Sequence, residues 1–545
     1  MVRTTVYLII SLVLLSSAAS SQVSSQGFDV TLKYADTLDQ YLDMLVNPDG
    51  SFYVVGADSL NGPDLSQHHQ GVLCKFNADF TLAWRRTYGG SKTDWFTKIK
   101  RYKDGTLLIG GHTWSNDGDV PYGFANTVHC PWVLILDSTG NILHGNAWGY
   151  GGQSELVDIS VTSDYKIFIT GATVSNLGDF AANTGPPFVP QFFTALADSQ
   201  LNKKWVKLFV NIYDAAPLGQ TMLKNDILLT GASTESNTGD YNVGSPLGSS
   251  DLFLFYIDTN QTITKKARYG GSNWEYASGI IAIDTNNILL HTPTSSTDGN
   301  LYANEIPSTN TATYWHTISK LDSSGTPRWN HLFGAFGANL NNSGPTATQI
   351  LDTTVDRYWV YGYVVGNDDG WIGHHPTADP FGLGDAFLWQ FDTSGHLIRK
   401  LRLGGKQTET VTFLRRMPNG KYIIGVPSWK DPPTDAFSCY PNTSCFSFYE
   451  LTEWPLSVQN TSLDETNVLS VYPNPSTNEL HICFKHDNKE KVKIRVLDQL
   501  GKEVLRSDFK QNETVIEIKN LIPGTYYIQL DYKEQKMQSS FIKEQ

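Results

Sequence analysis

Residues 104–148 read DGTLLIGGHTWSNDGDVPYGFANTVHCPWVLILDSTGNILHGNAW, and this stretch decides the fold class. The turn pair Asp104-Gly105 precedes an apolar run, a polar turn, a second apolar run and a last segment that ends in Trp148. With the alternating segment before it, the stretch predicts one four-stranded sheet with strands at 98–103, 106–113, 132–136 and 141–148. One such sheet cannot bury both of its faces, so further copies are expected.

The polar turn Ser115-Asn116-Asp117-Gly118-Asp119 recurs along the chain. Asp179 follows Asp119 by 60 residues, and Asp240 follows Asp179 by 61. Copies stand at 175–179 and 236–240, and looser copies at 61–64, 297–300 and 368–370. An acidic or amide residue ends each third strand, at Asn77, Asp137, Asp198, Asp258, Asp322 and Asp392. A repeat of this length with four strands is typical of a β-propeller blade.

A tryptophan occupies one fixed place in three units. Trp84, Trp205 and Trp329 each lie seven residues after the residue that ends the third strand. The same place in three other units holds His144, Lys265 and Arg399. A fixed offset predicts that each tryptophan packs against the neighbouring blade and is buried there.

The number of second strands predicts seven blades. They begin near Ser51, Thr106, Lys166, Asp226, Asn287, Tyr358 and Lys421. The last unit has a third strand near 446–451 but no fourth strand, whereas residues 30–34 look like a fourth strand without a blade. Pairing these two segments would close the ring and remove two sheet edges. The expected fold is all-β, with a seven-bladed β-propeller over residues 27–455.

The repeat resembles the long secreted propeller repeats of Bacteroidetes surface proteins. The resemblance depends on Trp329 and on the segments 115–119, 269–271 and 321–325, and it covers about residues 27–455. It implies an architecture and leaves the activity open.

The C-terminal region has a different pattern. Residues 456–467 are polar and irregular, as expected of a linker. Beyond them, period-two strands are predicted at 492–497, 515–518 and 526–530, with turns at Gly501 and at Pro523-Gly524. Residues 468–545 therefore predict a small β-sandwich.

This C-terminal domain is similar to the type A sorting domain of the type IX secretion system. The motif residues are Tyr472, Pro473, Asn474, Pro475, Gly501, Lys502, Gly524, Tyr526 and Lys543. The resemblance implies that the type IX machinery exports the chain across the outer membrane of a Bacteroidetes cell. It also implies that the domain is then removed and the cargo released or attached to surface lipopolysaccharide. The alternative is a generic β-sandwich binding module.

The N-terminus predicts a signal peptide over residues 1–20. Arg3 is the only charge before a mostly apolar run at 6–15, and small residues follow at 16–21. The run is short for a membrane span, and no later segment predicts one. A formal net charge of -13 argues against a nucleic-acid partner. The chain is therefore expected to be secreted or held at the cell surface.

The chain has five cysteines, an odd number. Cys439 and Cys445 bracket a short loop, and a local disulfide is plausible in an oxidising compartment. Cys74 lies in a predicted strand and is expected to be buried as a small apolar residue.

Ligand binding is expected on the loops after the second and fourth strands, because both sets reach the same face of a propeller. Long insertions there span 120–131, 180–191, 241–250, 301–313, 372–383 and 431–445. They contain Tyr122, Phe124, Tyr241, Tyr302, His374, His375 and Phe381. Aromatic and amide groups of this kind suit a glycan or a protein ligand.

Asn116, Asp117 and Asp119 are candidate Ca²⁺ ligands, because they present oxygen atoms in one turn. The same residue types also make tight turns by hydrogen bonding to their own backbone, and recurrence in many units favours that reading. No catalytic residue and no other cofactor is predicted.

Two functions remain open from the sequence. The first is a non-catalytic binding or adhesion protein. The second is an extracellular polymer-degrading enzyme, a glycan-active hydrolase or lyase, on the same scaffold. No nucleophile-elbow motif is present, and the Asp-Gly pattern at 298–299 and the 322–329 segment are better explained as hairpin turns. Clustered carboxylates with raised pKa values would favour the enzyme.

Overall fold

A computed structural model of the chain describes most of the predicted strands. The described residues are 23–26, 28–36, 39–58, 69–120, 128–149, 151–276, 279–284, 286–296, 298–300, 315–334, 357–364, 385–403, 410–428, 445–453, 469–472, 476–484, 491–498, 502–509, 513–532 and 535–543. The chain divides into two compact units, residues 1–453 and 454–545. The signal peptide predicted at 1–20 and the linker predicted at 456–467 lie outside the described residues.

The described part of the first unit forms seven antiparallel sheets, numbered here in chain order. Sheet 1 contains β3 (Asp39–Val46), β4 (Phe52–Asp58), β5 (Gly71–Phe76) and β6 (Leu82–Tyr88). Sheet 2 contains β7 (Asp94–Arg101), β8 (Leu107–Thr113), β9 (Cys130–Leu136) and β10 (Ile142–Ala147). Sheet 3 contains β11 (Ser154–Val161), β12 (Ile167–Thr173), β13 (Gln191–Ala197) and β14 (Lys203–Phe209).

The remaining sheets repeat this plan, with a first strand split in two in sheet 4. Sheet 4 contains β15 (Ala216–Pro217), β16 (Thr221–Met222), β17 (Leu228–Thr234), β18 (Asp251–Ile257) and β19 (Ile263–Tyr269). Sheet 5 contains β20 (Gly279–Ala282), β21 (Asn287–Thr294), β22 (Trp315–Asp322) and β23 (Pro327–Gly334). Sheet 6 contains β24 (Arg357–Val364), β25 (Asp385–Asp392), β26 (Leu397–Leu403) and β1 (Val23–Gln26), and sheet 7 contains β27 (Phe413–Arg416), β28 (Tyr422–Ser428), β29 (Cys445–Glu453) and β2 (Phe28–Asp36).

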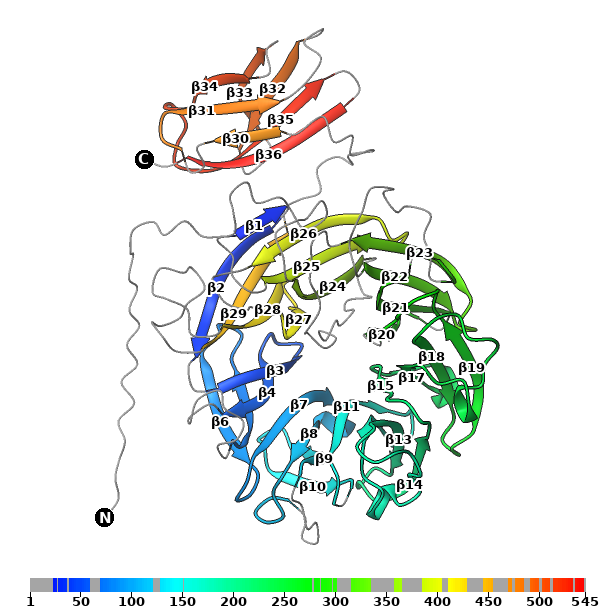
Figure 1. Cartoon of the computed structure of the whole chain (residues 1–545). Coiled ribbons are helices and arrows are strands. Elements are labelled where there is room, and N and C mark those ends of the chain that lie inside the picture. The colour runs from blue at the N-terminus through cyan, green and yellow to red at the C-terminus, as the bar shows by residue number, and fades with distance from the viewer. Residues whose placement is uncertain are drawn as a thin grey trace, which may run out of the picture. The chain divides into compact units, whose positions relative to one another are not determined.

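The sheets follow one another around a ring, which makes the first unit propeller-like (Figure 1). Buried apolar clusters join sheet 1 to sheet 2, sheet 2 to sheet 3, and so on through sheets 6 and 7. A further cluster joins sheet 7 to sheet 1 through Phe413, Phe446 and Phe448 on one side and Tyr41 and Phe52 on the other. The core of this unit therefore lies between sheets, as stacking of four-stranded units requires.

The N-terminal segment completes two sheets. Strand β2 pairs with β29 in antiparallel register, with Val30 opposite Leu451 and Tyr34 opposite Phe448. The predicted pairing of residues 30–34 with the last unit is therefore confirmed. Strand β1 also pairs with β26 of sheet 6, with Val23 opposite Leu403. That second pairing was not predicted, because only four residues carry it.

The hairpin turn predicted at Asp104-Gly105 is present. Asp104 has φ 54° and Gly105 has φ 79°, the left-handed pair that a tight two-residue hairpin needs. The turn forms η1 (Lys103–Gly105), and similar single turns form η2 (Gly178–Phe180), η3 (Lys224–Asp226) and η4 (Gly239–Tyr241).

The first strand of sheets 1, 2 and 3 carries a β-bulge at the same place. The register shifts between Tyr41 and Asp43, between Phe96 and Lys98, and between Leu156 and Asp158. Each bulge brings a first-strand carbonyl against a glycine of the second strand: Gly56, Gly111 and Gly171. A Cβ on Gly171 would lie 1.8 Å from the Glu155 carbonyl oxygen. In sheets 1, 2 and 3 the glycine of the second strand is thus a steric requirement of the bulge.

Gly171→Ala is therefore expected to destabilise the first unit by about 3 kcal/mol, because the new methyl group overlaps a backbone carbonyl that cannot rotate away. Gly219→Ala is the matched control. Its Cβ would lie 3.6 Å from the nearest atom, an Asp158 oxygen, and its cost should stay below about 1 kcal/mol. Urea unfolding of both variants measures the difference, and equal midpoints would contradict the steric explanation.

The three repeated tryptophans lie between sheets but are only half-buried, so the expected burial was too strong. Trp84, Trp205 and Trp329 pack at the edges of the clusters that join sheets 1 and 2, 3 and 4, and 5 and 6. The Trp205 indole N–H donates a hydrogen bond to the Thr259 carbonyl oxygen at 3.0 Å, from sheet 3 to the β18–β19 turn of sheet 4. Each tryptophan lies on an outer strand, and solvent reaches one side of it.

Trp205→Ala should lower the free energy of unfolding by about 2 kcal/mol, less than the about 3–5 kcal/mol of a fully buried tryptophan. Trp205→Phe keeps an aromatic ring but removes the indole N–H, and the lost hydrogen bond should cost about 1 kcal/mol. The exposed control Tyr213→Ala should stay within about 0.5 kcal/mol of the parent chain. Chemical denaturation measures all three, and a Trp205→Ala value equal to that of the control would refute the packing role.

Cys74 is buried, as predicted, and its Sγ lies 3.5 Å from the Tyr41 hydroxyl oxygen. The disulfide considered for Cys439 and Cys445 cannot be placed, because residues 429–444 and the Cys445 side chain lie outside the description.

The second unit also consists of β-strands in its described residues. One sheet contains β30 (Leu469–Tyr472), β31 (Glu479–Phe484) and β34 (Glu513–Glu517). The other contains β33 (Glu503–Phe509), β32 (Val492–Leu497), β35 (Gly524–Tyr532) and β36 (Gln535–Lys543). One buried cluster draws on both sheets, with Leu480 and Ile482 from the first and Val496, Ile528 and Phe541 from the second. Their alternation with polar residues explains why period-two patterning predicted strands here.

Candidate functional site

The polar turn of sheet 2 binds the backbone of the link between sheets 1 and 2. An Asp119 carboxylate oxygen accepts from the Gly89 N–H at 3.1 Å, and one of Asp117 accepts from the Ser91 N–H at 2.7 Å. The Ser115 hydroxyl oxygen accepts from the Lys92 N–H at 3.0 Å. Hydrogen bonding from the Ser91 N–H holds the pKa of Asp117 below its usual range. The turn therefore clasps one sheet to the next.

Other units repeat this clasp. Asp179 accepts from the Gly149 N–H at 2.9 Å, and Asn300 accepts from the Gly270 N–H at 2.8 Å. Asp298 accepts from the Ser272 N–H at 2.6 Å. In these links the glycine segment and the polar turn are thus the two halves of one contact, which the sequence presented as separate turns. In sheet 4, by contrast, Asp240 pairs with Lys207 and Lys266.

The calcium hypothesis for Asn116, Asp117 and Asp119 gains no support from this geometry. Both carboxylates accept backbone N–H groups, and Asn116 is exposed. Within the described residues, no group of three or more His, Cys, Asp and Glu side chains is placed to hold a metal ion. Calcium at this turn stays a prediction.

Two buried carboxyl groups lie under the clasps. Asp94 accepts from the Gly90 N–H at 2.9 Å and from the Ser115 hydroxyl at 2.8 Å. Glu275 accepts from the Gly271 N–H at 3.2 Å and from the Thr294 hydroxyl at 2.7 Å. Burial raises the pKa of both groups, in spite of these hydrogen bonds. Each carboxyl is engaged by its own turn, a structural role.

Glu275 predicts a pH dependence of stability. Its folded-state pKa is raised above 4.5, so ionisation opposes folding: its contribution is complete below pH 4.5 and is lost as pH rises through the folded-state pKa. Glu275→Gln should therefore remove a stability decrease that the parent chain shows above pH 4.5. Urea unfolding from pH 4 to 7 tests this through the difference between variant and parent. Parallel curves for the two proteins would contradict the raised pKa.

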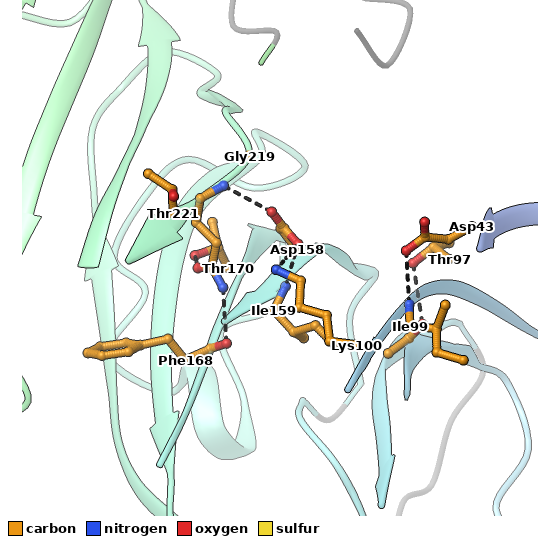
Figure 2. Close-up of polar contacts among 12 residues, drawn as sticks. Asp43, Thr97, Ile99, Lys100, Asp158, Ile159, Phe168, Thr170, Gly219 and Thr221 are labelled. Carbon is orange, nitrogen blue, oxygen red and sulfur yellow. Dashed lines mark hydrogen bonds and ion pairs between the residues drawn. The ribbon is translucent and has the colours of Figure 1, made fainter. Parts of the chain in front are cut away.

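Polar contacts also link the first strands of neighbouring sheets (Figure 2). The Lys100 ammonium lies 3.5 Å from one Asp158 oxygen, and the Gln220 N–H donates to the other at 3.1 Å. Burial raises the pKa of Asp158, but the charges of Lys100 and Lys98 and the Gln220 hydrogen bond bring it below the usual range. Asp158 of sheet 3 is thus bound to sheets 2 and 4.

Asp43 makes the equivalent contact between sheets 7, 1 and 2. Its carboxylate accepts from the Ile99 N–H at 2.9 Å, as Figure 2 shows, and pairs with the Arg415 guanidinium. Arg415 also donates from Nε to the Met44 carbonyl oxygen at 2.7 Å. The bulge positions Asp43 and Asp158 therefore connect neighbouring sheets, and their carboxylates are already engaged.

A different group of residues lies at the loop ends of sheets 2 and 3. We call Trp95, His112, Trp114, His129 and Glu155 the Trp–His cluster. The Trp95 and His112 rings stack with centroids 4.7 Å apart, and the Trp114 and His129 rings stack at 5.9 Å. His129 also meets the ring of Trp95 edge-on at 5.5 Å, and its Nε2 lies 3.5 Å from a Glu155 oxygen. The cluster joins four side chains of sheet 2 to one of sheet 3.

The cluster has a neutral imidazole and an ionised carboxylate. Burial and the nearby His129 lower the pKa of His112 to about 3. The His129 ring, whose Nε2 lies 3.5 Å from a Glu155 oxygen, lowers the pKa of Glu155 to about 2, against the effect of burial. The His112 Nδ1 and Trp114 Nε1 atoms are buried and have no hydrogen-bond partner among the described residues. A buried polar group without a hydrogen-bond partner costs free energy.

The sequence analysis missed this cluster, although the repeat contained a signal. The repeats can be aligned on a shared Thr-x-Ser segment, which His112 directly precedes in sheet 2. The residue at the same place is Ala172 in sheet 3 and Ser233 in sheet 4. The place of Trp114 holds Val174 in sheet 3. Sheets 3 and 4 pack with smaller residues at these places. The large rings in sheet 2 are therefore not required for the packing of the repeat.

The aromatic loop residues predicted to bind ligand give a different result. Tyr241 is wholly buried against Phe209 and Phe253, so its assignment to a ligand surface was wrong. It lies at the end of η4, where the short loop turns the ring inward. The other predicted loop residues lie outside the described residues: Tyr122, Phe124, Tyr302, His374, His375 and Phe381.

The sorting-motif residues of the second unit lie mostly in turns and strand ends. Asp498 and Lys502 close a hairpin turn, with the Lys502 N–H donating to an Asp498 oxygen at 2.9 Å. The Tyr526 ring stacks on Phe541 at 5.5 Å, and Lys543 is buried at the end of β36. Gly524 has φ 156° and begins β35, and Tyr472 ends β30. Pro473, Asn474, Pro475 and Gly501 lie outside the described residues.

An all-β, propeller-like unit followed by a small β unit defines the class of protein. Residues 470–544 match the family described as secretion system C-terminal sorting domain. The chain thus carries a type IX sorting tail and is a secreted or outer-membrane surface protein. The expected partnership with the type IX machinery follows from the same tail. Among the described residues, no helix is long and apolar enough to cross a membrane.

Solved structures with a similar arrangement are distant. PorZ, a surface component of the type IX secretion system of Porphyromonas gingivalis, is 12% identical with a TM-score of 0.39 over 93% of this chain and 59% of its own. The chain thus spans less than two thirds of PorZ. Sqt1 of Chaetomium thermophilum is 8% identical with a TM-score of 0.39 over 78% of this chain and 100% of its own. Comparison with curated proteins finds no match.

Proposed function

We propose that the protein is a non-catalytic binding protein that acts outside the cell after type IX export and holds its ligand at the Trp–His cluster. The observation that carries the proposal is that the described carboxylates differ in what they bind. The carboxylates Asp43, Asp94, Asp117, Asp158 and Glu275 each bind the backbone of a neighbouring segment. The Glu155 carboxylate of the Trp–His cluster makes no such contact with backbone N–H groups among the described residues. Half of the Glu155 side chain is exposed.

We also propose that the seven sheets are the blades of one seven-bladed β-propeller over residues 27–455, and that residues 468–545 form a β-sandwich. The apolar clusters between successive sheets, including the one between sheets 7 and 1, support the ring. The cluster shared by the two C-terminal sheets supports the sandwich. A signal peptide at 1–20 and a linker at 456–467 complete the proposed organisation.

Binding is tested with the chain lacking only residues 1–20, applied to arrays of extracellular glycans and of cell-surface proteins. The proposal expects selective retention on one class of ligand with no change in the ligand's covalent structure. Retention on neither array would overturn it.

The alternative is a polymer-degrading enzyme, and His129–Glu155 is a histidine–carboxylate pair at the loop ends that such chemistry could use. Incubation of the same chain with soluble polysaccharides, followed by size analysis of the products, distinguishes the two functions. Shortened products that disappear in His129→Gln would establish the enzyme and refute the binding proposal.

A further inference from the structure

The side chains of the Trp–His cluster indicate which class of ligand it binds. This inference rests on the proposed function. The propeller repeat does not need the cluster, since sheets 3 and 4 hold small residues at the place of His112. It nevertheless assembles two indoles and two imidazoles from β7, β8 and the loop between β8 and β9. Indole faces supply a large apolar contact area at low conformational cost, which suits a flat, amphipathic ligand such as a sugar ring.

The polar atoms around the rings suit hydroxyl groups. Glu155 is ionised, with half of its side chain exposed, and so accepts hydrogen bonds but does not donate them. Gln153 donates to Glu155 at 3.1 Å and is itself exposed. The His112 Nδ1 atom is buried and has no hydrogen-bond partner among the described residues. The exposed half of the Glu155 side chain can accept a further hydrogen bond from a ligand hydroxyl.

The charges argue against an anionic ligand. Glu155 is ionised, whereas burial and the nearby His129 keep His112 neutral at physiological pH. The His129 Nε2 atom faces the Glu155 carboxylate at 3.5 Å, so the charge that the cluster presents to a ligand is that of Glu155. A uronic acid or sulfated sugar would therefore meet like charge at the site.

We propose that the Trp–His cluster binds a neutral pyranose unit of a glycan, with the sugar ring against an indole face and its hydroxyls donating to Glu155. Trp95 and Trp114 are the stacking residues, Glu155 is the acceptor, and His129 positions the Glu155 carboxylate.

The test measures binding of the chain lacking residues 1–20 to neutral oligosaccharides of glucose, mannose, galactose and N-acetylglucosamine, with uronic-acid oligosaccharides in parallel. Trp95→Ala, Trp114→Ala and Glu155→Gln should each weaken binding of the neutral probe about tenfold or more. Trp274→Ala is the control, because Trp274 is an exposed tryptophan that lies outside the cluster, in the link before sheet 5. It should bind as the parent chain does.

The outcomes separate this inference from the proposed function. A chain that binds neutral glycans equally well in parent, Trp95→Ala and Trp114→Ala overturns the site, and so does a preference for uronic acids. Binding to proteins alone would overturn the ligand class and leave the binding function standing. Binding to neither glycans nor proteins would overturn both the ligand class and the binding function. Trp114→Phe covers the case in which Trp114→Ala does not fold. It should unfold with the parent midpoint and keep part of the affinity.

Discussion

Deletion of residues 23–36 is expected to open the first unit and to cost most of its free energy of unfolding. The deletion removes eight paired residues of β2 from β29 and four of β1 from β26. It also removes Tyr34, which packs edge-on against Phe76 of sheet 1 at 4.9 Å and stacks on Phe448 at 5.4 Å. Because small and medium domains are stable by only about 5–15 kcal/mol, loss of a strand that joins the two chain ends should prevent cooperative unfolding.

Thermal unfolding and sedimentation of the deletion variant measure this effect, with an early, broad transition and self-association through the exposed β29 edge as the expected result. Lys33→Ala is the control, because it removes only the exposed half of the Lys33–Glu450 ion pair at 3.1 Å and should cost less than about 1 kcal/mol. Addition of a synthetic 23–36 peptide should restore part of the lost transition. An unchanged midpoint in the deletion variant would show that the ring is closed without its N-terminal strands.

Deletion of residues 468–545 is expected to abolish delivery to the cell surface while leaving the first unit folded. The deleted segment contains the whole sorting-domain match at 470–544. It has its own buried cluster around Ile482, Ile494 and Phe541, separate from the clusters between the seven sheets. The first unit should therefore keep its unfolding midpoint, since its core loses none of these side chains.

Cell fractionation in a host with a type IX system measures the export, and the truncated chain should accumulate in the periplasm. The full-length chain in a strain without that system is the control and should accumulate in the same place. Ile522→Ser, at an exposed position of the tail, should be exported normally and shows that a change in the tail is not enough by itself. Surface delivery of the truncated chain would refute the sorting role of the tail.

Local chemistry made much of this fold predictable. The Asp-Gly turn at 104–105, the strand-ending Asp residues and the seven second strands all depend on hydrogen bonds and dihedral preferences within a few residues. Asp137 shows this directly, because one of its oxygens accepts from the Thr139 N–H at 2.8 Å and the Asn141 N–H at 2.9 Å. The pairing of 30–34 with the last unit was predictable for a different reason, namely that each segment lacked a partner.

The site was less predictable, because its residues are distant in the sequence and come together only when the sheets stack. Trp95 and Glu155 are separated by a whole repeat, and Tyr241 looks like a loop residue until the phenylalanines of two sheets surround it. The clasp also needed the structure, since Asp119 finds Gly89 only when sheet 2 is placed beside sheet 1.

The sequence by itself determined the repeat, its turns, the closing strand and the exported class of the protein, because those depend on short-range patterns and on one compact motif-rich tail. Only the tertiary structure decided which carboxylates are already bound to backbone and which rings gather at the loop ends. The physical reason is that a side chain's burial, pKa and partners come from the neighbouring sheet, and neighbouring sheets contribute residues about sixty positions apart.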